Sequence, residues 1–268
     1  MEQKSEQKKE ITPYDRVLIA RKNNRPLITD YIDALFDDFI ELKGDRLAGE
    51  DSSILGGIAL FHNNPVTVIG HRKGKTTEEN IKYNFGMTSP EGYRKAVRLM
   101  KQAEKFHRPV ISFVDTPGAY PGLEAETNGQ SNAIAESIAC MMGLTVPTVT
   151  FITGEGSSGG ALAIAAADGV YMLENAVYSI LSPEGFAAIM WKDAAKASEA
   201  CDIMKITAAE LLDYGLIDGI VPEGRRCFAT INRILVNELN RLTKMSENTL
   251  VANRYKKYRN IEGKYKPV

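Results

Sequence analysis

The residues whose types and spacing most directly suggest chemistry lie in the stretch FITGEGSSGGALAIAAAD, residues 151–168. Three glycine patterns overlap there: the G-x-G-x-x-G of dinucleotide-binding turns, the G-x-S-x-G of serine hydrolases, and the G-x-x-x-x-G that opens a P-loop. They are formed by Gly154, Gly156, Ser158, Gly159 and Gly160. Each pattern predicts a different reaction, so residues elsewhere in the chain have to decide between them.

The side chains that each reaction needs are missing or out of order. A P-loop needs a lysine after its second glycine, where this chain has Gly160 and Ala161, so the switch-like DTPG at 115–118 has no phosphate cradle to serve. An α/β-hydrolase places its histidine after the serine, whereas every histidine here precedes Ser158. The histidines are His62, His71 and His107. A dinucleotide site opens a first strand–helix–strand unit, but this loop comes late, and the acid Glu174 follows too closely.

What the three patterns share is a strand, a tight turn and a helix of small residues. A strand that ends at Ile152 would be followed by glycines that allow a sharp turn, and GGALAIAAAD would then pack closely in a core. The N–H groups of such a turn bind an anion, or the negative charge that develops in a transition state. The alternative is a tight strand–helix junction with no function, and spacing alone leaves both open.

Composition and charge narrow the class of protein. Of the 268 residues, 44% are hydrophobic and 25% charged, which is ordinary for a globular protein of one large domain or two small ones. The formal net charge of −1 makes nucleic acid and anionic membrane unlikely partners. The polar N-terminus MEQKSEQKKE is not a signal peptide, and no run approaches the ~18 apolar residues of a membrane helix. Three widely spaced cysteines indicate neither a disulfide framework nor a zinc cluster, so we expect a cytoplasmic location.

The elements around the glycine stretch predict an α/β protein, because short β-rich segments alternate with helical ones after residue 57. Two of these strands echo each other, PVISFV at 109–114 and PTVTFI at 147–152, and each leads at once into a glycine-containing loop. PVTVIG at 65–70 is a weaker third copy. The repeat suggests stacked strand–helix turns, although a generic alternation of strands and helices would also produce it.

Helix signals place further elements. Residues 26–43 carry apolar residues at helical spacing and are expected to form one amphipathic helix, whose start Thr29 or Asp30 could cap. The sequence SPEG occurs at 89–92 and again at 182–185. Serine before Pro-Glu suits an N-cap followed by proline at the first helical position, so a helix is expected to begin at each.

The two ends of the chain are expected to be peripheral. From residue 225 the sequence is helical, and basic residues interleave with Tyr255, Tyr258 and Tyr265. Aromatic and basic side chains together could hold single-stranded RNA, but a solvated helix end and subunit contact is the favoured interpretation. We divide the chain into a polar tail and short helix (1–24), a main domain (25–224) and a helical extension (225–268).

Seven ordered blocks carry a resemblance to a known family. They are RPLITDYIDALFDDFIELKGDR, GHRKGK, NFGMTSPEGYRKAVRLM, FVDTPGAYPG, GEGSSGGALAIAAAD, YSILSPEGFAAIMW and LIDGIVPE. Between Arg25 and Glu223 the chain resembles the carboxyltransferase α subunits of bacterial acetyl-CoA carboxylase. The resemblance implies an α/β, crotonase-like (ClpP/crotonase) fold, a spiral of repeated ββα units with helical N- and C-terminal extensions, which agrees with the echoing strands.

The reaction and the partners follow from the resemblance. It implies carboxyl transfer from carboxybiotin, delivered in trans by a biotin carboxyl carrier protein, to acetyl-CoA, giving malonyl-CoA for fatty acid synthesis. The other implied partners are the ATP-binding biotin carboxylase and a zinc-ribbon-bearing β subunit, with which the chain would form an α₂β₂ heterotetramer. No metal is implied for this chain. No biotin-accepting lysine is evident either, because Lys101 and Lys205 each have methionine on one side only.

Site residues are also implied. The backbone amides of Gly86, Met87, Gly159 and Gly160 would stabilise the charge on the biotin ureido oxygen. The biotin slot would be lined by Pro117, Gly118, Ala119, Tyr120, Gly156, Ser157 and Ser158. A purely structural turn is an equal alternative for 117–122, and a helix cap is favoured for 182–185. The basic run of Arg72, Lys73 and Lys75 is interpreted as an exposed loop rather than as a contact for CoA phosphates or the carrier.

Two other classes of function stay open. A self-sufficient crotonase-like enzyme, such as an enoyl-CoA hydratase or isomerase, would need carboxylates over its substrate, and Leu162 stands where one could be supplied. A non-catalytic scaffold that only binds a partner is the other.

Overall fold

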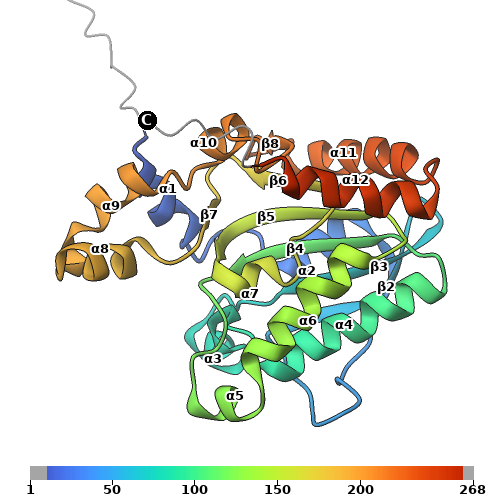
Figure 1. Cartoon of the computed structure of the whole chain (residues 1–268), viewed down its shortest axis with the longest axis horizontal. Helices are drawn as coiled ribbons and strands as arrows, with labels where there is room; N and C mark the ends of the chain where they lie inside the picture. The colour runs from blue at the N-terminus through green and yellow to red at the C-terminus, as the bar shows by residue number, and fades with distance from the viewer. Residues whose placement is uncertain (1–10, 262–268) are drawn as a thin grey trace, which may run out of the picture.

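A single curved sheet with helices on both sides forms the body of the molecule (Figure 1). The computed structural model describes residues 11–261. The strands are β1 (Asp37–Glu41), β2 (Ile54–Phe61), β3 (Asn64–His71), β4 (Val110–Thr116), β5 (Thr148–Ser157), β6 (Gly169–Leu173), β7 (Val177–Ser179) and β8 (Gly219–Val221). In Figure 1 the helices α4 and α6 lie side by side below the sheet, α11 and α12 cross above it, and α8 and α9 extend to the left.

The helices are mostly short. They are α1 (Pro13–Ala20), α2 (Ile28–Leu35), α3 (Thr77–Lys82), α4 (Pro90–Lys105), α5 (Leu123–Thr127), α6 (Gln130–Gly143), α7 (Ser158–Leu162), α8 (Pro183–Trp191), α9 (Ala197–Met204), α10 (Ala208–Asp213), α11 (Cys227–Leu242) and α12 (Glu247–Arg259), with 3-10 turns η1 (Asn84–Gly86) and η2 (Ala194–Lys196). Among residues 11–261 no helix is long and apolar enough to cross a lipid bilayer.

The echoing segments become the three central strands. The sheet order is β1-β2-β3-β4-β5-β6-β8, with β7 paired to the end of β5; β1, β2 and β3 are antiparallel, and every later pairing is parallel. Thr67, Val110 and Thr148 lie in register across β3, β4 and β5. The carboxyl ends of these strands therefore lie at one edge of the sheet, and the loops that follow them are brought together there.

An aromatic row ties these strands to each other and to α2. The rings of Phe113, Phe151 and Tyr171 stack from β4 to β6 at centroid distances of 5.7 Å, and Tyr31 of α2 stacks on Phe113 at 5.1 Å. All but Tyr171 are at most 1% exposed. Stacked aromatic side chains bury large apolar areas, so this row fixes the spacing of the strands beneath the loops.

The expectation of one helix over 26–43 is wrong in its second half. Helix α2 ends at Leu35, and Asp37–Glu41 forms β1 at the edge of the sheet, antiparallel to β2. Asp38 has φ 50°, and the ladder is irregular beside it. Pairing with β2 gives the backbone groups of β1 partners that outweigh the helical spacing of its side chains. At the start of α2, Asp30 accepts the N–H of Leu27 at 2.8 Å instead of serving as the N-cap residue.

Both SPEG segments begin a helix, as predicted, but only one serine caps with its side chain. Ser182 accepts the N–H of Gly185 at 3.1 Å at the start of α8. Ser89 occupies the N-cap of α4, yet its hydroxyl and N–H both donate to Asp51, at 2.8 and 2.7 Å. The first SPEG is therefore fastened to the loop before β2, which holds the chain that leads into α4.

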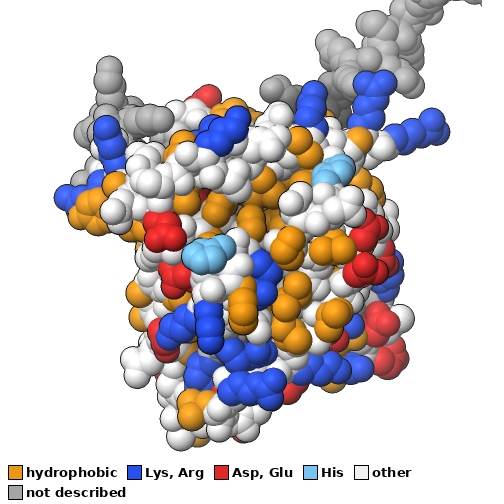
Figure 2. All heavy atoms as spheres, turned by 90° about the vertical axis from the view of Figure 1, so that its right-hand side faces the viewer, with side chains coloured by type: hydrophobic (Ala, Val, Ile, Leu, Met, Phe, Trp, Pro, Cys, Tyr) orange, Lys and Arg blue, Asp and Glu red, His pale blue; other side chains and the backbone are white. Residues whose placement is uncertain are grey.

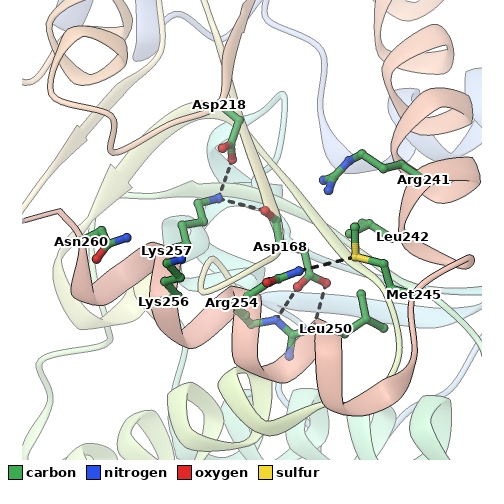
Figure 3. A pocket seen from close by; sticks show the side chains of 11 residues that line it. Asp168, Asp218, Arg241, Leu242, Met245, Leu250, Arg254, Lys256, Lys257 and Asn260 are labelled. Carbon is green, nitrogen blue, oxygen red and sulfur yellow. Dashed lines mark hydrogen bonds and ion pairs between the residues drawn. The ribbon is translucent and has the colours of Figure 1, made fainter.

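The C-terminal helix α12 is held against the body by one buried cation (Figure 3). Arg254 is 1% exposed, and its Nη2 lies 2.8 Å from Asp168 Oδ2. Its remaining N–H groups donate to Asp168 Oδ1 and to backbone carbonyls. Those carbonyls belong to Met141, Met142, Leu144 and Val146. Nearby, Tyr258 donates to the carbonyls of Ala165 and Ala167. Arg254 and Tyr258, which belong to the basic and aromatic segment considered for RNA binding, therefore pack inside the protein. Tyr265 lies outside the described residues.

Candidate functional site

Three loops meet at the carboxyl edge of β3, β4 and β5: residues 86–89, 117–122 and 154–160. Thr88 and Ala119 form a parallel bridge, and the N–H of Tyr120 donates to Thr88 O at 3.0 Å. A Cβ on Gly160 would lie 2.7 Å from Ala119 N and 2.9 Å from Gly118 C, so the last two loops touch through their backbones. The structure thus brings together the loops that the resemblance assigned to one site.

The third loop is a strained turn. Gly156 and Ser157 are the buried last residues of β5 and pair with Tyr178 and Ser179 of β7. Ser158, which follows, is exposed and has φ 59°, a left-handed conformation that costs a non-glycine residue roughly 1–2 kcal/mol. Such strain persists only where the surrounding structure imposes it, and it is concentrated at functional sites.

The amides of the glycine pair are available. Gly159 and Gly160 stand in the first turn of α7, where N–H groups have no intrahelical acceptor. Within residues 11–261 neither N–H has a hydrogen-bond acceptor. Gly160 is buried and Gly159 half-buried, so a charge placed here would be only partly screened by water.

The loop at 86–89 differs from expectation. Asn84, Phe85 and Gly86 have φ values of 48°, 54° and 76°, and this left-handed run turns the chain so tightly that its amides bond back. The N–H of Gly86 donates to Tyr83 O and that of Met87 to Asn84 O, each at 2.8 Å. Both N–H groups are therefore already engaged, and neither is free to bind an anion in this conformation.

The loop at 117–122 packs against Gly160, where the amides of Gly86 and Met87 were expected to lie. Gly118 has φ 145° and open space around its Cα, and its N–H donates to Thr116 Oγ1 at 3.0 Å. Gln130 of α6 donates to the carbonyls of Thr88 and Tyr120, at 2.8 and 3.0 Å, which fastens this loop to the one at 86–89. The N–H of Ala119 has no acceptor within residues 11–261, and its nitrogen would lie 2.7 Å from a Cβ on Gly160.

A chain of alternating charges lies beside these loops. Lys73 Nζ is 2.7 Å from Asp115 Oδ1 and 3.4 Å from Glu155 Oε2, and Arg21 Nε is 2.8 Å from Glu155 Oε1. Arg21 also pairs with Glu184 of α8 at 2.7 Å. Burial opposes the charge of Lys73, but the attraction of Asp115 and Glu155 outweighs it and raises the pKa of the ammonium. The expectation that Lys73 belongs to an exposed basic loop is wrong, because it stands between two acids that the sequence separates by 40 residues.

One histidine was undervalued by sequence reasoning. His71, the last residue of β3, is 2% exposed, and neither ring nitrogen makes a hydrogen bond of normal geometry among the described residues, although the ring interacts with the backbone of Gly160. Burial, together with the charge of Lys73, lowers the pKa of its imidazole to about 3, so the ring is neutral. The hydroxyl of Tyr93 is likewise buried without a hydrogen bond of normal geometry among the described residues, although it interacts with Thr88, and it would lie 2.8 Å from a Cβ on Gly160. The sequence signal for it was the position of His71 at the end of a largely apolar strand.

The other two histidines lie at the opposite edge of the sheet. A groove of about 590 Å³ there is lined by His62, His107 and apolar side chains of the β2–β3 turn and α11, on the face shown in Figure 2. His62 Nε2 lies 3.3 Å from Asn232 Oδ1, and His107 faces Glu247 at 4.0 Å. Neither contacts the glycine turn, so neither supplies a base to Ser158.

Comparison with known proteins identifies the family. The family model described as acetyl co-enzyme A carboxylase carboxyltransferase-like matches residues 1–262. A relative from Geobacillus sp. (strain WCH70) is 54% identical over 259 residues, covering 94% of this chain and 80% of its own. Another from Clostridium acetobutylicum is 53% identical over 268 residues, 97% of each chain. Both are named acetyl-coenzyme A carboxylase carboxyl transferase subunit alpha.

Solved structures agree on the fold. Transcarboxylase 12S superposes with a TM-score of 0.71 at 19% identity, over 88% of this chain and 46% of that one. The β subunit of geranyl-CoA carboxylase from P. aeruginosa gives 0.66 at 15% identity, over 85% and 45%. At these identities the likeness concerns the fold, which is the expected crotonase-like one. With a matching model over nearly its whole length and relatives above 50% identity, the chain belongs to the family of acetyl-CoA carboxylase carboxyltransferase α subunits.

Proposed function

We propose that this chain is the α half of a biotin-dependent carboxyltransferase that moves a carboxyl group to acetyl-CoA and forms malonyl-CoA. Family membership supports the reaction. In this proposal carboxybiotin arrives on a separate carrier protein, a β subunit with a zinc ribbon completes the site, and the two subunits form an α₂β₂ assembly in the cytoplasm. Biotin carboxylase recharges the carrier.

The backbone of the glycine turn has the chemistry that this step requires. When bound, carboxybiotin supplies the carboxyl group and leaves negative charge on its ureido oxygen. The N–H groups of Gly159 and Gly160 are unpaired within the described residues, and Ala119 N adjoins Gly160. Hydrogen bonds from such fixed donors to a developing anion are worth roughly 3–4 kcal/mol each, or 100- to 1000-fold in rate.

A single observation supports this site more than the others: the backbone contact between Gly160 and the 118–119 peptide. It means that the Ala119 nitrogen lies next to Gly160 and that there is no room for a side chain at Gly160, which supports a pair of donors from these two loops. We therefore assign the second donor to Ala119 rather than to Gly86 or Met87, whose N–H groups are engaged. Pro117, Gly118, Tyr120 and Ser158 remain proposed neighbours of biotin.

The test is Gly159→Val, assayed for carboxyl transfer with the β subunit and a biotin analogue. A Cβ at Gly159 would lie 3.2 Å from Ile134 Cγ2, a contact that this flexible side chain can relieve, so the fold should survive. The valine side chain should block the N–H of Gly159 and fill the biotin slot. We therefore expect kcat to fall by about 100- to 1000-fold, as when one such donor is lost, with an unchanged Tm. Gly143→Val, at the end of α6 with open space around it, is the matched control.

Two outcomes would overturn the proposal. A normal rate for Gly159→Val would exclude the glycine turn as the anion site. Activity of the wild-type chain without the β subunit would instead indicate a self-sufficient enzyme.

A further inference from the structure

Lys73 stands at the junction of all three loops, and nothing in the proposed chemistry uses it. We propose that Lys73 is a positioning residue for carboxyl transfer: its ammonium holds Asp115 and Glu155 together and thereby fixes the glycine turn against the neighbouring loops. The inference rests on the proposed function, because it assumes that the turn is where the reaction is catalysed.

The contacts of Lys73 reach the ends of three strands. It follows β3, its Nζ is 2.7 Å from Asp115 Oδ1 at the end of β4, and it is 3.4 Å from Glu155 Oε2 on β5. Its stem also supports the first loop, since a Cβ on Gly86 would lie 3.0 Å from Lys73 Cγ. One side chain therefore contacts the loop at 86–89, the end of β4 just before the loop at 117–122, and the glycine turn.

Asp115 transmits this contact to the backbone of the turn. Its Oδ1 accepts both the Lys73 ammonium and the N–H of Glu155, the latter at 3.0 Å. Gly154 packs so closely on the same carboxylate that a Cβ there would overlap it. If the carboxylate moves, Gly154 and Glu155 move with it, and Ser158, Gly159 and Gly160 are only a few residues farther along the chain.

Lys73 is one of two cations that pair with the three carboxylates of this cluster. Two carboxylates, on Asp115 and Glu155, face it directly, and Arg21 is shared between Glu155 and Glu184. The other titratable groups that interact with this cluster are His71, which is buried and neutral, and Arg25 and Tyr31, which both interact with Asp115. Without the ammonium, Asp115 keeps no cation within ion-pair distance in the described residues, and it stands beside a second carboxylate. Like charges at such distances favour uptake of a proton.

Solvent can reach this cluster. The Lys73 side chain is 17% exposed at a cavity of about 320 Å³ that it shares with Phe85 and Pro117, the residues adjoining the two proposed loops. A proton can therefore enter from water when the lysine is removed, and it can neutralise one of the two carboxylates and so relieve their repulsion.

The test compares Lys73→Met with wild type in the complex with the β subunit. The reaction is measured in reverse, from malonyl-CoA to a biotin analogue. At pH 8 we expect kcat to fall by roughly 100-fold, the effect of a misplacement of about 1 Å, while the KM for malonyl-CoA stays unchanged. Lowering the pH to 6.5 should restore part of the loss, because protonation of one carboxylate relieves the repulsion between the two, whereas wild type should show no such gain. Lys73→Met/Asp115→Asn should recover activity at pH 8, since it removes the unpaired charge.

Lys101→Met, which breaks a solvent-exposed pair with Glu136, is the matched control and should behave as wild type. Wild-type kcat for Lys73→Met at both pH values would overturn the inference. So would a loss that neither low pH nor Asp115→Asn relieves, because this would indicate general unfolding or direct contact with substrate. If Lys73→Met fails to fold, the double variant alone decides, by its activity at pH 8.

The two proposals fail separately. Full activity of Gly159→Val removes the proposed site whatever Lys73 does. Loss of activity in Gly159→Val together with a wild-type Lys73→Met removes only the positioning role.

Discussion

Two buried charged clusters in this molecule are built differently. At the C-terminal helix, Arg254 and Asp168 form a cluster in which each guanidinium nitrogen has an acceptor (Figure 3). At the glycine turn, His71 lies next to Lys73 and Tyr93 lies next to Gly160, and within residues 11–261 the polar atoms of both buried side chains make no hydrogen bond of normal geometry. Left-handed non-glycine residues, Ser158 among them, occur in the loops of the second cluster.

The contrast separates structural from chemical use of buried charge. Natural proteins satisfy nearly all of their buried polar groups, because an unmade hydrogen bond in the interior costs about 1–3 kcal/mol. A cluster with saturated bonding can only hold elements together. A cluster that retains unpaired groups and backbone strain is maintained at a cost to stability, which is what a site arranged for an absent ligand requires.

The largest effect on stability is expected at the saturated cluster. Arg254→Met leaves the Asp168 carboxylate buried without its cation and four carbonyls without a donor. Breaking a buried pair in this way costs about 3–5 kcal/mol, measurable as a lower free energy of unfolding in urea. Arg241→Met, which breaks an exposed pair with Glu238, should cost at most about 1 kcal/mol. Equal losses in the two variants would contradict the contrast.

A smaller, pH-dependent effect is expected from His71. Its folded pKa of about 3 lies below the ordinary 6.5, so the unfolded chain binds a proton that the folded chain does not. The stability that His71 contributes is present above pH 6.5 and is lost as the pH falls toward 3, by about 1.4 kcal/mol per pH unit. At pH 5 the loss should be about 2 kcal/mol. Unfolding of His71→Leu measured between pH 5 and 8 should show a correspondingly shallower slope, and an unchanged slope would show that His71 is not buried neutral.

The smallest effect is expected from the serine of the strained turn. Ser158→Ala keeps the backbone donors and removes only the hydroxyl, so carboxyl transfer should change by less than about threefold. The measurement is kcat in the complex with the β subunit. A loss of 100-fold would mean that the side chain takes part and that the comparison rests on the wrong atoms.

Much of the fold could be predicted from local sequence patterns, and the predictions failed where contacts between distant segments decide the structure. Strands at 65–70, 109–114 and 147–152 were predicted because proline, β-branched residues and a glycine loop recur together, and they became β3, β4 and β5. Residues 37–41 were misassigned because their helical spacing is overruled by pairing with β2, a partner that no local pattern specifies. Ser89 could not be distinguished from Ser182 without knowing that Asp51 lies beside it.

The candidate site divides in the same way. Its loops could be located because glycine and proline mark tight turns in any context. The sequence could not show which amides are free, because this depends on the left-handed run at Asn84, Phe85 and Gly86. The pairing of Lys73 with Asp115 and Glu155 joins residues 42 and 82 positions apart, so it appears only once the strands are side by side.

Arg21, just past the end of α1, has a practical consequence for anyone who shortens this protein. The recognisable motifs start at Arg25, so a truncated version beginning there would look harmless on paper. Yet it would delete Arg21, the cation that joins Glu155 of the glycine turn to Glu184 of α8. The shortened protein would keep all the family motifs and still lose the ion pairs that connect the glycine turn to α8.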